Sequence, residues 1–489
     1  MNVIQSEIPM VRMRNVVAAL GVSAVASAAV ASGVLNEVQE LNAPPSEYGA
    51  FGAEVALDGE TLLVCSPAND TLGMDVGFCW ILTRDWNGTF THHQTLMGSD
   101  IGMFERFGYA AAMSGEVLVI GSKVKVVDGL VDAGAAYVFE RMDGDWVETA
   151  IITAPVPQQG ALFSSSVDID GDTIVIGARN ADDLAGAAWI YARDESGDWV
   201  SQGALIGTGV DAGDSFGFSA AIQGDTALVG APYLASCGGT SKCGGVFVFE
   251  RDGDAWVEVD LLLPDDLGSE DYFGWDCDLD EDGDRIVATS VYDDDNAWQA
   301  GAGYVWDKQD EGSWSQMAKL LPSDGSEQDM CKSCEVQGDT VVIASWYGNE
   351  DKGEAWVWRK NADQWTEVAM LRASDGETID IFGRSAALDG DTVVIGADWH
   401  NVDGFENAGA AYVFDISGST LPTGACCSNG DCVAATLNDC AAFGGTYHGD
   451  GSACADVDCA AACPSDIDGS GDVAVDDLLQ VIGDWGLCP

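Results

Sequence analysis

Residues 216–233 read FGFSAAIQGDTALVGAPY, and residues 244–256 of the same unit read GGVFVFERDGDAW. Related units recur along the chain, and each carries a Gly followed by Asp or Glu between two apolar runs. A recurrence of this kind predicts a repeat architecture in which every unit is one small structural module. The seven turn glycines lie 52 to 59 residues apart and are Gly59, Gly115, Gly171, Gly224, Gly283, Gly338 and Gly390.

Each unit predicts four short strands. The first strand alternates apolar and polar residues, and the Gly-Asp pair turns the chain into an apolar second strand such as residues 392–397. Residues 134–139 are typical of the third strand, and a charged turn leads from it to a Trp that opens the fourth. These tryptophans are Trp86, Trp146, Trp199, Trp256, Trp314 and Trp365.

The seventh unit lacks a fourth strand, because its pattern stops at Asp415. Residues 36–44, near the start of the chain, resemble the fourth-strand residues 365–374 of the sixth unit. This offset predicts a ring closed by an N-terminal strand, which leaves few exposed strand edges. The fold class is therefore predicted to be all-β, with a seven-bladed β-propeller over residues 32–417. An open β-solenoid is the alternative, and the displaced fourth strand argues against it.

The combination of a Phe-Gly pair, a Gly-Asp turn and a Gly-Ala-Ala-Tyr-Val-Phe strand resembles bacterial FG-GAP repeats, which are related to the propeller of integrin α subunits. The resemblance covers about residues 34–416. It implies an extracellular protein associated with adhesion or ligand binding, although a fold does not by itself define a function. The sixth unit departs from the pattern, because Met330 and Cys331 stand where the other units have Phe followed by Gly or Ser.

The chain is strongly acidic. Its 489 residues include 20 Lys and Arg against 81 Asp and Glu, which gives a net charge of −61. Nucleic acid and anionic membrane surfaces are not expected as partners, because a phosphate-rich surface requires a basic binding face. The acidity favours solubility in a saline exterior, and recognition of a specific ligand is the alternative.

Residues 1–31 are predicted to be a signal peptide. Arg12 and Arg14 precede an apolar, Ala-rich run over residues 16–31, and the small residues at 26–31 fit a cleavage site. Secretion or display at the cell surface is therefore expected. No other stretch is long and apolar enough to predict a transmembrane anchor.

Fifteen cysteines in an exported chain predict disulfides. The odd total leaves at least one thiol unpaired or paired with another molecule. The pairs that the propeller permits are Cys65 with Cys79, Cys237 with Cys243, and Cys277 with Cys334.

Two small modules are predicted after the propeller. Residues 418–424 form a linker rich in Ser, Thr, Pro and Gly, and residues 425–460 form a Cys-rich module. So short a module cannot build a large core, so three disulfides are expected to hold it. Residues 461–489 are predicted to form a calcium loop followed by a helix.

The calcium loop has twelve positions. Oxygen ligands are expected at positions 1, 3, 5, 7 and 12, and position 6 needs a Gly for the sharp turn, which Gly471 supplies. Position 9 is Ala474, and a turn-rich acidic linker is the alternative. The predicted calcium ligands are Asp466, Asp468, Ser470, Asp472 and Asp477.

This segment resembles one half of a type I dockerin, whose loops end in Asp followed by Leu, as Asp477 and Leu478 do here. Complete dockerins carry two such halves and bind cohesins. The resemblance implies an anchor with a cohesin-like or cell-surface partner, and a single half is equally compatible with a surface-attachment or sorting tag.

Residues 278–284 read DLDEDGD and offer a second acidic candidate. They resemble the calcium loops within integrin-like blades, but Ile286 stands where the last ligand is needed. An extended hairpin turn is the better interpretation.

The long, variable loops between strands two and three and between blades are expected on one face of the ring, where function concentrates. Their aromatic residues beside carboxylates and amides suit sugar stacking or a basic protein partner, and packing within their own loops is the alternative. The predicted ligand-face residues are Tyr233, Tyr292, Asp294, Trp298, Trp346, Tyr347, Trp399 and His400.

Catalysis has little support in the sequence. None of the four histidines stands in a recognisable nucleophile, metal or acid–base motif. A secreted, non-catalytic binding or adhesion protein is therefore expected, with an extracellular glycan or protein as ligand and a calcium-binding anchor. The alternative is a polysaccharide-active extracellular enzyme or its carbohydrate-binding subunit.

Overall fold

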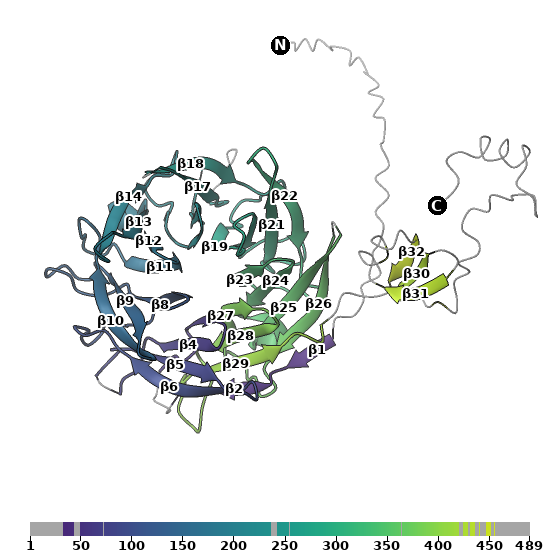
Figure 1. Ribbon diagram of the computed structural model, residues 1–489, viewed down its shortest axis with the longest axis horizontal. Helices are drawn as coiled ribbons and strands as arrows, with labels where there is room; N and C mark the ends of the chain where they lie inside the picture. Colours follow the sequence, from purple (N-terminus) through teal and green to yellow (C-terminus); the bar gives the residue numbers. More distant parts are fainter. Residues whose placement is uncertain are drawn as a thin grey trace, which may run out of the picture. The chain divides into compact units, whose positions relative to one another are not determined.

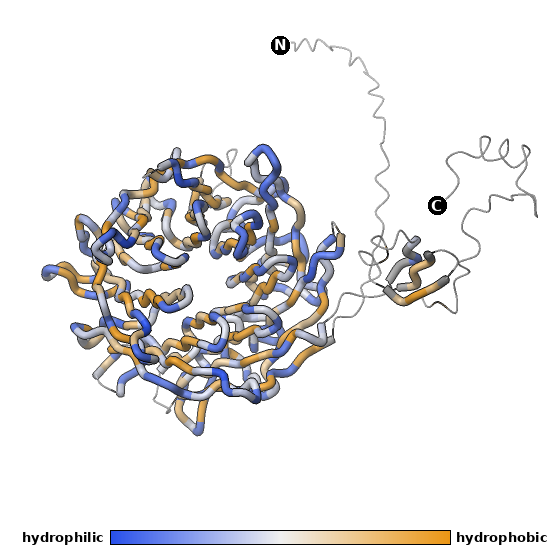
Figure 2. The backbone as a smooth tube through the Cα atoms, viewed as in Figure 1, coloured by the Kyte–Doolittle hydropathy of each residue, from blue (hydrophilic) through white to orange (hydrophobic). Residues whose placement is uncertain are grey.

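The computed structural model describes residues 33–43, 49–71, 73–235, 242–253, 255–362, 364–419, 424–428, 431–435, 440, 446–450 and 454. Seven sheets of these residues surround a central channel (Figure 1). The predicted all-β, seven-bladed propeller is therefore confirmed. Figure 2 shows apolar residues along the strands and hydrophilic residues gathered at many of the connections, as the strand and turn patterns predict.

Each blade runs from an inner strand beside the channel to an outer strand. Blade one contains β3 (Glu54–Asp58), β4 (Thr61–Ser66), β5 (Phe78–Arg84) and β6 (Phe90–Leu96). Blade two contains β7 (Ala110–Ser114), β8 (Val117–Ser122), β9 (Ala135–Met142) and β10 (Asp145–Ile152). Blade three contains β11 (Phe163–Asp170), β12 (Thr173–Ala178), β13 (Ala187–Arg193) and β14 (Trp199–Leu205). Blade four contains β15 (Ala220–Gln223), β16 (Thr226–Gly230), β17 (Val246–Asp252) and β18 (Ala255–Leu262). Blade five contains β19 (Phe273–Leu279), β20 (Arg285–Ser290), β21 (Ala302–Lys308) and β22 (Trp314–Leu320).

Blades six and seven complete the ring. Blade six contains β23 (Cys331–Gln337), β24 (Thr340–Ser345), β25 (Glu354–Asn361) and β26 (Gln364–Arg372). Blade seven contains β27 (Phe382–Asp389), β28 (Thr392–Ala397) and β29 (Ala410–Asp415). Two single turns, α1 (Ala181–Leu184) and α2 (Gly348–Asp351), interrupt the connections between second and third strands of blades three and six.

The ring closes through the N-terminal segment. β2 (Gln39–Leu41) pairs antiparallel with β29 as the fourth strand of blade seven, with Leu41 opposite Ala411. This confirms the predicted closure. One feature was not expected: β1 (Gly33–Asn36) pairs parallel with β26 and adds a fifth strand to blade six.

Gln39 fastens this closure to blade one. Its amide nitrogen donates to the carbonyl of Phe90 at 2.7 Å, and its amide oxygen accepts from the N–H of Phe90 at 2.8 Å. Gln94 makes the same pair of bonds to Trp146 between blades one and two. The interface between blades seven and one, where the ring closes, therefore has the same hydrogen bonds as the interface between blades one and two.

The blades contact each other through buried aromatic residues and close backbone approaches. The Phe of each Phe-Gly or Phe-Ser pair is at most 2% exposed, and Cys331 takes its place in blade six at 0%. Gly134, just before β9, has φ +87°, and a Cβ there would lie 2.0 Å from the carbonyl oxygen of Phe163 in the next blade. Six other glycines occupy this place: Gly77, Gly186, Gly244, Gly301, Gly353 and Gly409.

The turn glycines also bind the neighbouring blade. The N–H of Gly115 donates to the carboxylate of Asp58 at 2.6 Å, and the N–H of Gly224 donates to Asp170 at 2.8 Å. Each of these carboxylates ends the inner strand of the preceding blade. The Asp that precedes the turn glycine in these blades therefore serves to bind the next blade.

Residues 280–284 form the turn between β19 and β20. The carboxylate of Asp280 accepts from the N–H groups of Asp284 and Arg285 at 3.1 and 3.0 Å. These bonds support the prediction of an extended hairpin turn.

The prediction that Trp86 opens a fourth strand was wrong. Trp86 is 92% exposed in the preceding turn, and Phe90 opens β6 opposite Arg84. The guanidinium of Arg84 lies 4.6 Å from the Phe90 ring centre, as that of Arg193 lies 4.7 Å from Trp199 in blade three. This turn has the same length as that of blade three, but the aromatic position after it holds a Phe in place of a Trp.

The disulfides agree with an exported protein, because cytosolic thiols stay reduced. Cys65 and Cys79 are bonded across β4 and β5, as predicted. Cys243 is disulfide-bonded, and Cys237 lies outside the described residues. The permitted Cys277–Cys334 bridge is not formed, since both thiols are free and buried, as is Cys331.

The Cys-rich module contains a sheet of β30 (Gly424–Ser428), β31 (Asp431–Ala435) and β32 (Thr446–Asp450), in the order β31-β30-β32. Disulfides join Cys426 to Cys440 and Cys432 to Cys454. The predicted signal peptide and the predicted calcium segment 461–489 lie outside the described residues. No helix of the described chain is long and apolar enough to cross a membrane.

Candidate functional site

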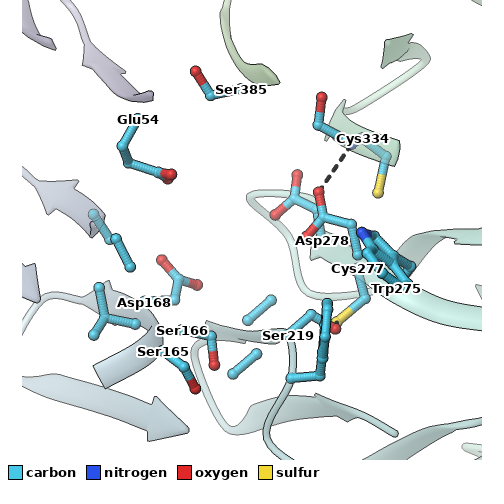
Figure 3. Close-up of a pocket in the computed structure, with 18 of the residues that line it drawn as sticks. Glu54, Ser165, Ser166, Asp168, Ser219, Trp275, Cys277, Asp278, Cys334 and Ser385 are labelled. Atoms are coloured by element: carbon cyan, nitrogen blue, oxygen red, sulfur yellow. Dashed lines mark hydrogen bonds between the residues drawn. The ribbon is translucent and has the colours of Figure 1, made fainter. Parts of the chain in front are cut away.

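The seven inner strands enclose a cavity of about 780 Å³ along the axis of the ring. Figure 3 shows Glu54 of blade one and Asp168 of blade three directing their carboxylates into this cavity, with Asp278 and Trp275 of blade five across from them. Because each blade contributes the same strand, equivalent residues of the repeats form layers along the channel.

The outermost layer is at the end of the channel nearest the loops between blades. In most blades it comprises the residue two places after the interface Phe. The irregular segment at the start of the inner strand is one residue shorter in blade six than in blade three, so Lys332, one place after Cys331, takes this position. We call this layer, together with Lys123, Arg179 and Trp346 beside it, the channel mouth. Its large members, at or just before the inner strands, are Tyr109, Phe218, Trp275, Lys332 and Arg384.

Basic side chains of the channel mouth lie over aromatic rings. The ammonium of Lys332 is 3.3 Å from the centre of the Trp346 ring, and that of Lys123 is 3.0 Å from Tyr109. The guanidinium of Arg179 is 4.9 Å from the Phe218 ring. Such contacts hold a cation against the face of the ring.

Few of these cations are paired with carboxylates. Arg384 is bound to Asp398 at 3.3 Å, whereas Lys123, Arg179 and Lys332 form no ion pair within the described chain. Four of only 20 basic residues therefore gather at one place in a chain of net charge −61. This placement concentrates basic side chains at the channel mouth of an otherwise acidic chain.

The cations shift the protonation of their neighbours. Burial alone would raise the pKa of Tyr109, but the charges of Lys123, Arg384 and Arg179 outweigh it and lower the pKa to about 7. Burial lowers the pKa of Lys123 to about 8, and burial together with Arg384 holds the pKa of Lys332 well below its usual range. An anionic ligand would favour the charged forms of both lysines.

Carboxyl groups line the channel below the mouth. Burial raises the pKa of Glu54 to about 8 and that of Asp168 to about 7. Burial also raises the pKa of Asp278 and of Glu335 well above the usual range. The charge of Asp168 raises the pKa of Asp278 further, and that of Asp278 raises the pKa of Glu335. At neutral pH Glu54, Asp278 and Glu335 therefore hold protons, and Asp168 is partly protonated.

Two of these carboxyl groups also join blades. Asp168 accepts from the N–H of Ile222 in blade four at 2.6 Å, and Asp278 accepts from the N–H of Val336 in blade six at 2.8 Å. They therefore brace the inner strands as well as lining the channel.

Half of the predicted ligand-face residues meet at this site. Tyr233 lines the channel, and Trp346 lines both the channel and an adjoining cavity of about 200 Å³. Tyr292 and Tyr347 line that second cavity, beside Lys332. The prediction from long loops therefore identified four residues that line the channel or the adjoining cavity.

The other predicted residues line neither cavity. Trp298 and Trp399 are 53% and 43% exposed. Asp294 accepts from the N–H of Gln299 at 2.6 Å within its own loop. His400 is buried, with Nδ1 2.9 Å from the carboxylate of Asp380.

Sequence reasoning missed five residues because they lie at or just before the inner strands rather than in the long loops. They are Tyr109, Phe218, Trp275, Lys332 and Arg384. A signal was available, because all five occupy one position of the repeat, shortly after the interface Phe or Cys, and the other two repeats have the small residues Ala53 and Ser165 there.

Comparison with known proteins identifies the repeat. The model of the FG-GAP repeat matches residues 90–139, 146–191, 199–249, 256–306 and 365–414, which together make up about half of the chain. Each matched segment begins at or near an outer strand and ends in the third strand of the next blade.

No curated protein matches the chain. Among solved structures, the crystal structure of a protein from Lactobacillus plantarum is similar at 14% identity and a TM-score of 0.46, over 66% of this chain and 86% of that one. The repeat match, together with seven blades of the same construction, shows that this chain belongs to the FG-GAP repeat family.

Proposed function

We propose that the chain is a secreted, non-catalytic binding protein that takes an extracellular ligand at the channel mouth. The observation that carries this proposal is the cluster of basic side chains over aromatic rings, three of them without an ion pair in the described chain. A concave site with aromatic walls and few convergent polar groups is typical of ligand binding.

The ligand that fits best carries an anionic group beside a flat apolar face. Lys332 and Arg384 would bind the anion, and the rings of Trp275 and Trp346 would stack on the apolar face. Polysaccharides that contain uronic acids combine both features. An acidic segment of a protein is the other ligand with this chemistry.

The test is titration calorimetry of the full chain with a galacturonic acid oligosaccharide. The same oligosaccharide with methyl-esterified carboxylates is the matched neutral ligand and should bind at least about 10-fold more weakly. Arg384→Ala should weaken binding of the acidic form by about 10- to 100-fold, because a hydrogen bond to a charged group contributes about 1.5–3 kcal/mol.

Arg106→Ala is the control, since Arg106 pairs with Asp75 at 2.9 Å away from the channel mouth. Circular dichroism and the melting temperature of each variant separate loss of binding from loss of fold. Equal affinity of parent and Arg384→Ala, or no binding by any member of an acidic glycan array, would refute the proposed site.

The second candidate function is a polysaccharide-active enzyme, and the protonation of groups in the channel favours it. A phenol with pKa about 7, as at Tyr109, can act as a general base at neutral pH, and buried carboxyl groups of raised pKa can act as acids. A lyase and hydrolase screen on acidic polysaccharides decides between the two. Turnover that Tyr109→Phe abolishes would replace the binding proposal with an enzymatic one.

Display through residues 461–489 completes the proposal, with Ca²⁺ as the cofactor. It rests on the sequence of the loop, whose ligands would be Asp466, Asp468, Ser470, Asp472 and Asp477. Calorimetry of the full chain with Ca²⁺ should show one tight event that weakens at least about 10-fold in Asp466→Ala. The control Glu195→Ala removes one exposed charge from the propeller, and an unchanged isotherm in Asp466→Ala would remove the calcium site.

A further inference from the structure

Three groups that can bind a metal meet where the ring closes. Glu40 lies on the closing strand β2, Asp375 follows β26, and His400 follows β28. One ligand atom from each lies within 4.8 Å of the other two. Glu40 is far from the other two residues in the sequence, so only the pairing of β2 with β29 brings it to them.

The imidazole of His400 is held in one orientation. Its side chain is 8% exposed, and Nδ1 lies 2.9 Å from the carboxylate of Asp380, which is 3% exposed. A carboxylate that accepts from one ring nitrogen of a histidine commonly fixes the other nitrogen for a metal. Here the other nitrogen, Nε2, faces Oδ2 of Asp375 at 3.6 Å, which is longer than a hydrogen bond.

Asp375 is also held in place. The hydroxyl of Tyr412 donates to its Oδ1 at 3.0 Å, which leaves Oδ2 toward the imidazole. Glu40 lies opposite Tyr412 in the β2–β29 register and is exposed. The three candidate ligands therefore consist of one buried, oriented nitrogen, one oriented carboxylate and one carboxylate with access to solvent.

The chemistry of the three groups selects the kind of ion. Imidazole nitrogen favours a transition metal over Ca²⁺ or Mg²⁺, and two carboxylates with one histidine are ligands that Zn²⁺ accepts. Three protein ligands leave one position open for water. With Asp380 behind the histidine, three carboxyl groups surround one imidazole, and a divalent cation would balance their negative charge.

We propose that Glu40, Asp375 and His400 bind one divalent transition metal ion, with Zn²⁺ as the best match, and that this ion fastens the closing strand β2 to blade seven. The ion links the N-terminal strand to the connection between blades six and seven and to the connection between β28 and β29, so it stabilises the ring at its closing interface. This site lies on different residues from the channel mouth and does not depend on the proposed function.

The test uses the full chain stripped of metal and kept in excess CaCl₂, which occupies acidic surface sites. Co²⁺ is the probe, because its visible absorption reports nitrogen and oxygen ligands, and Zn²⁺ should displace it at one equivalent. Asp380→Asn should weaken Zn²⁺ binding by about 10- to 100-fold, the usual effect of removing such a supporting carboxylate. His400→Ala should remove the absorption.

Two further variants separate binding from folding. Glu40→Gln changes an exposed residue, so the fold should persist while Zn²⁺ affinity falls at least about 10-fold and the Zn²⁺-dependent rise in melting temperature is lost. His93→Ala removes an exposed histidine 3.4 Å from Asp145 and should change nothing. Absence of a saturable Co²⁺ spectrum, or equal Zn²⁺ affinity in the parent, Glu40→Gln and His400→Ala, would overturn the site.

Discussion

Gly134→Ala is expected to lower the free energy of unfolding by about 3 kcal/mol. The residue has φ +87°, where an L side chain is strained by roughly 1–2 kcal/mol. Its Cβ would also lie 2.0 Å from the carbonyl oxygen and 2.6 Å from the nitrogen of Phe163. These are backbone atoms of the next blade, so blades two and three must separate, at a further cost of roughly 1–3 kcal/mol.

Gly129→Ala is the matched control for this prediction. Gly129 lies in the same blade with φ +82°, but a Cβ there would meet nothing within 4 Å. Its cost should therefore be the backbone strain alone, about 1 kcal/mol. Urea denaturation followed by circular dichroism measures both variants. Equal losses in the two would mean that contact between blades at Gly134 contributes nothing.

Glu54→Gln is expected to make the protein more stable at alkaline pH. Burial raises the pKa of Glu54 from about 4.5 to about 8, so the folded chain binds a proton between these pH values that the unfolded chain has released. The stability of the parent therefore falls as pH rises through this window and is fully present only below about 4.5. Glutamine does not titrate and avoids this loss.

The difference between Glu54→Gln and the parent should be small at pH 4.5 and grow to roughly 3–5 kcal/mol at pH 9, at about 1.4 kcal/mol for each unit of pKa shift. Denaturation midpoints over this range measure it. Glu195→Gln, in an exposed turn, should show a pH-independent difference. A Glu54→Gln curve parallel to the parent would show that Glu54 is ionised in the folded protein across the whole range.

The architecture could be predicted from the sequence because its signals are local and repeated. A Gly-Asp pair favours a turn, and a short apolar run bounded by turns is typical of a buried strand. The closing strand was also accessible, because residues 36–44 kept the pattern of a fourth strand. Trp86 was assigned wrongly because the aromatic position of blade one holds Phe90, whereas the Trp of this blade lies within the preceding turn.

The candidate site was harder to predict because its residues are brought together by the ring. Lys332 and Arg384 lie in consecutive repeats, and each by itself looks like one polar residue on an alternating strand. Their contacts with Trp346 arise only when two inner strands reach the same axis. His400 shows the reverse case, since its loop position predicted exposure and its bond to Asp380 buries it.

The sequence by itself determined the repeat, the four strands of each blade, the number of blades and the strand that closes the ring, because each depends on contacts between residues close in the chain or on a missing copy of a repeated pattern. Only the tertiary structure decided which side chains share the channel mouth, which carboxyl groups keep their protons, and that Glu40 meets His400. Those properties depend on distances between blades and on exclusion of water, and both are set by closure of the whole ring.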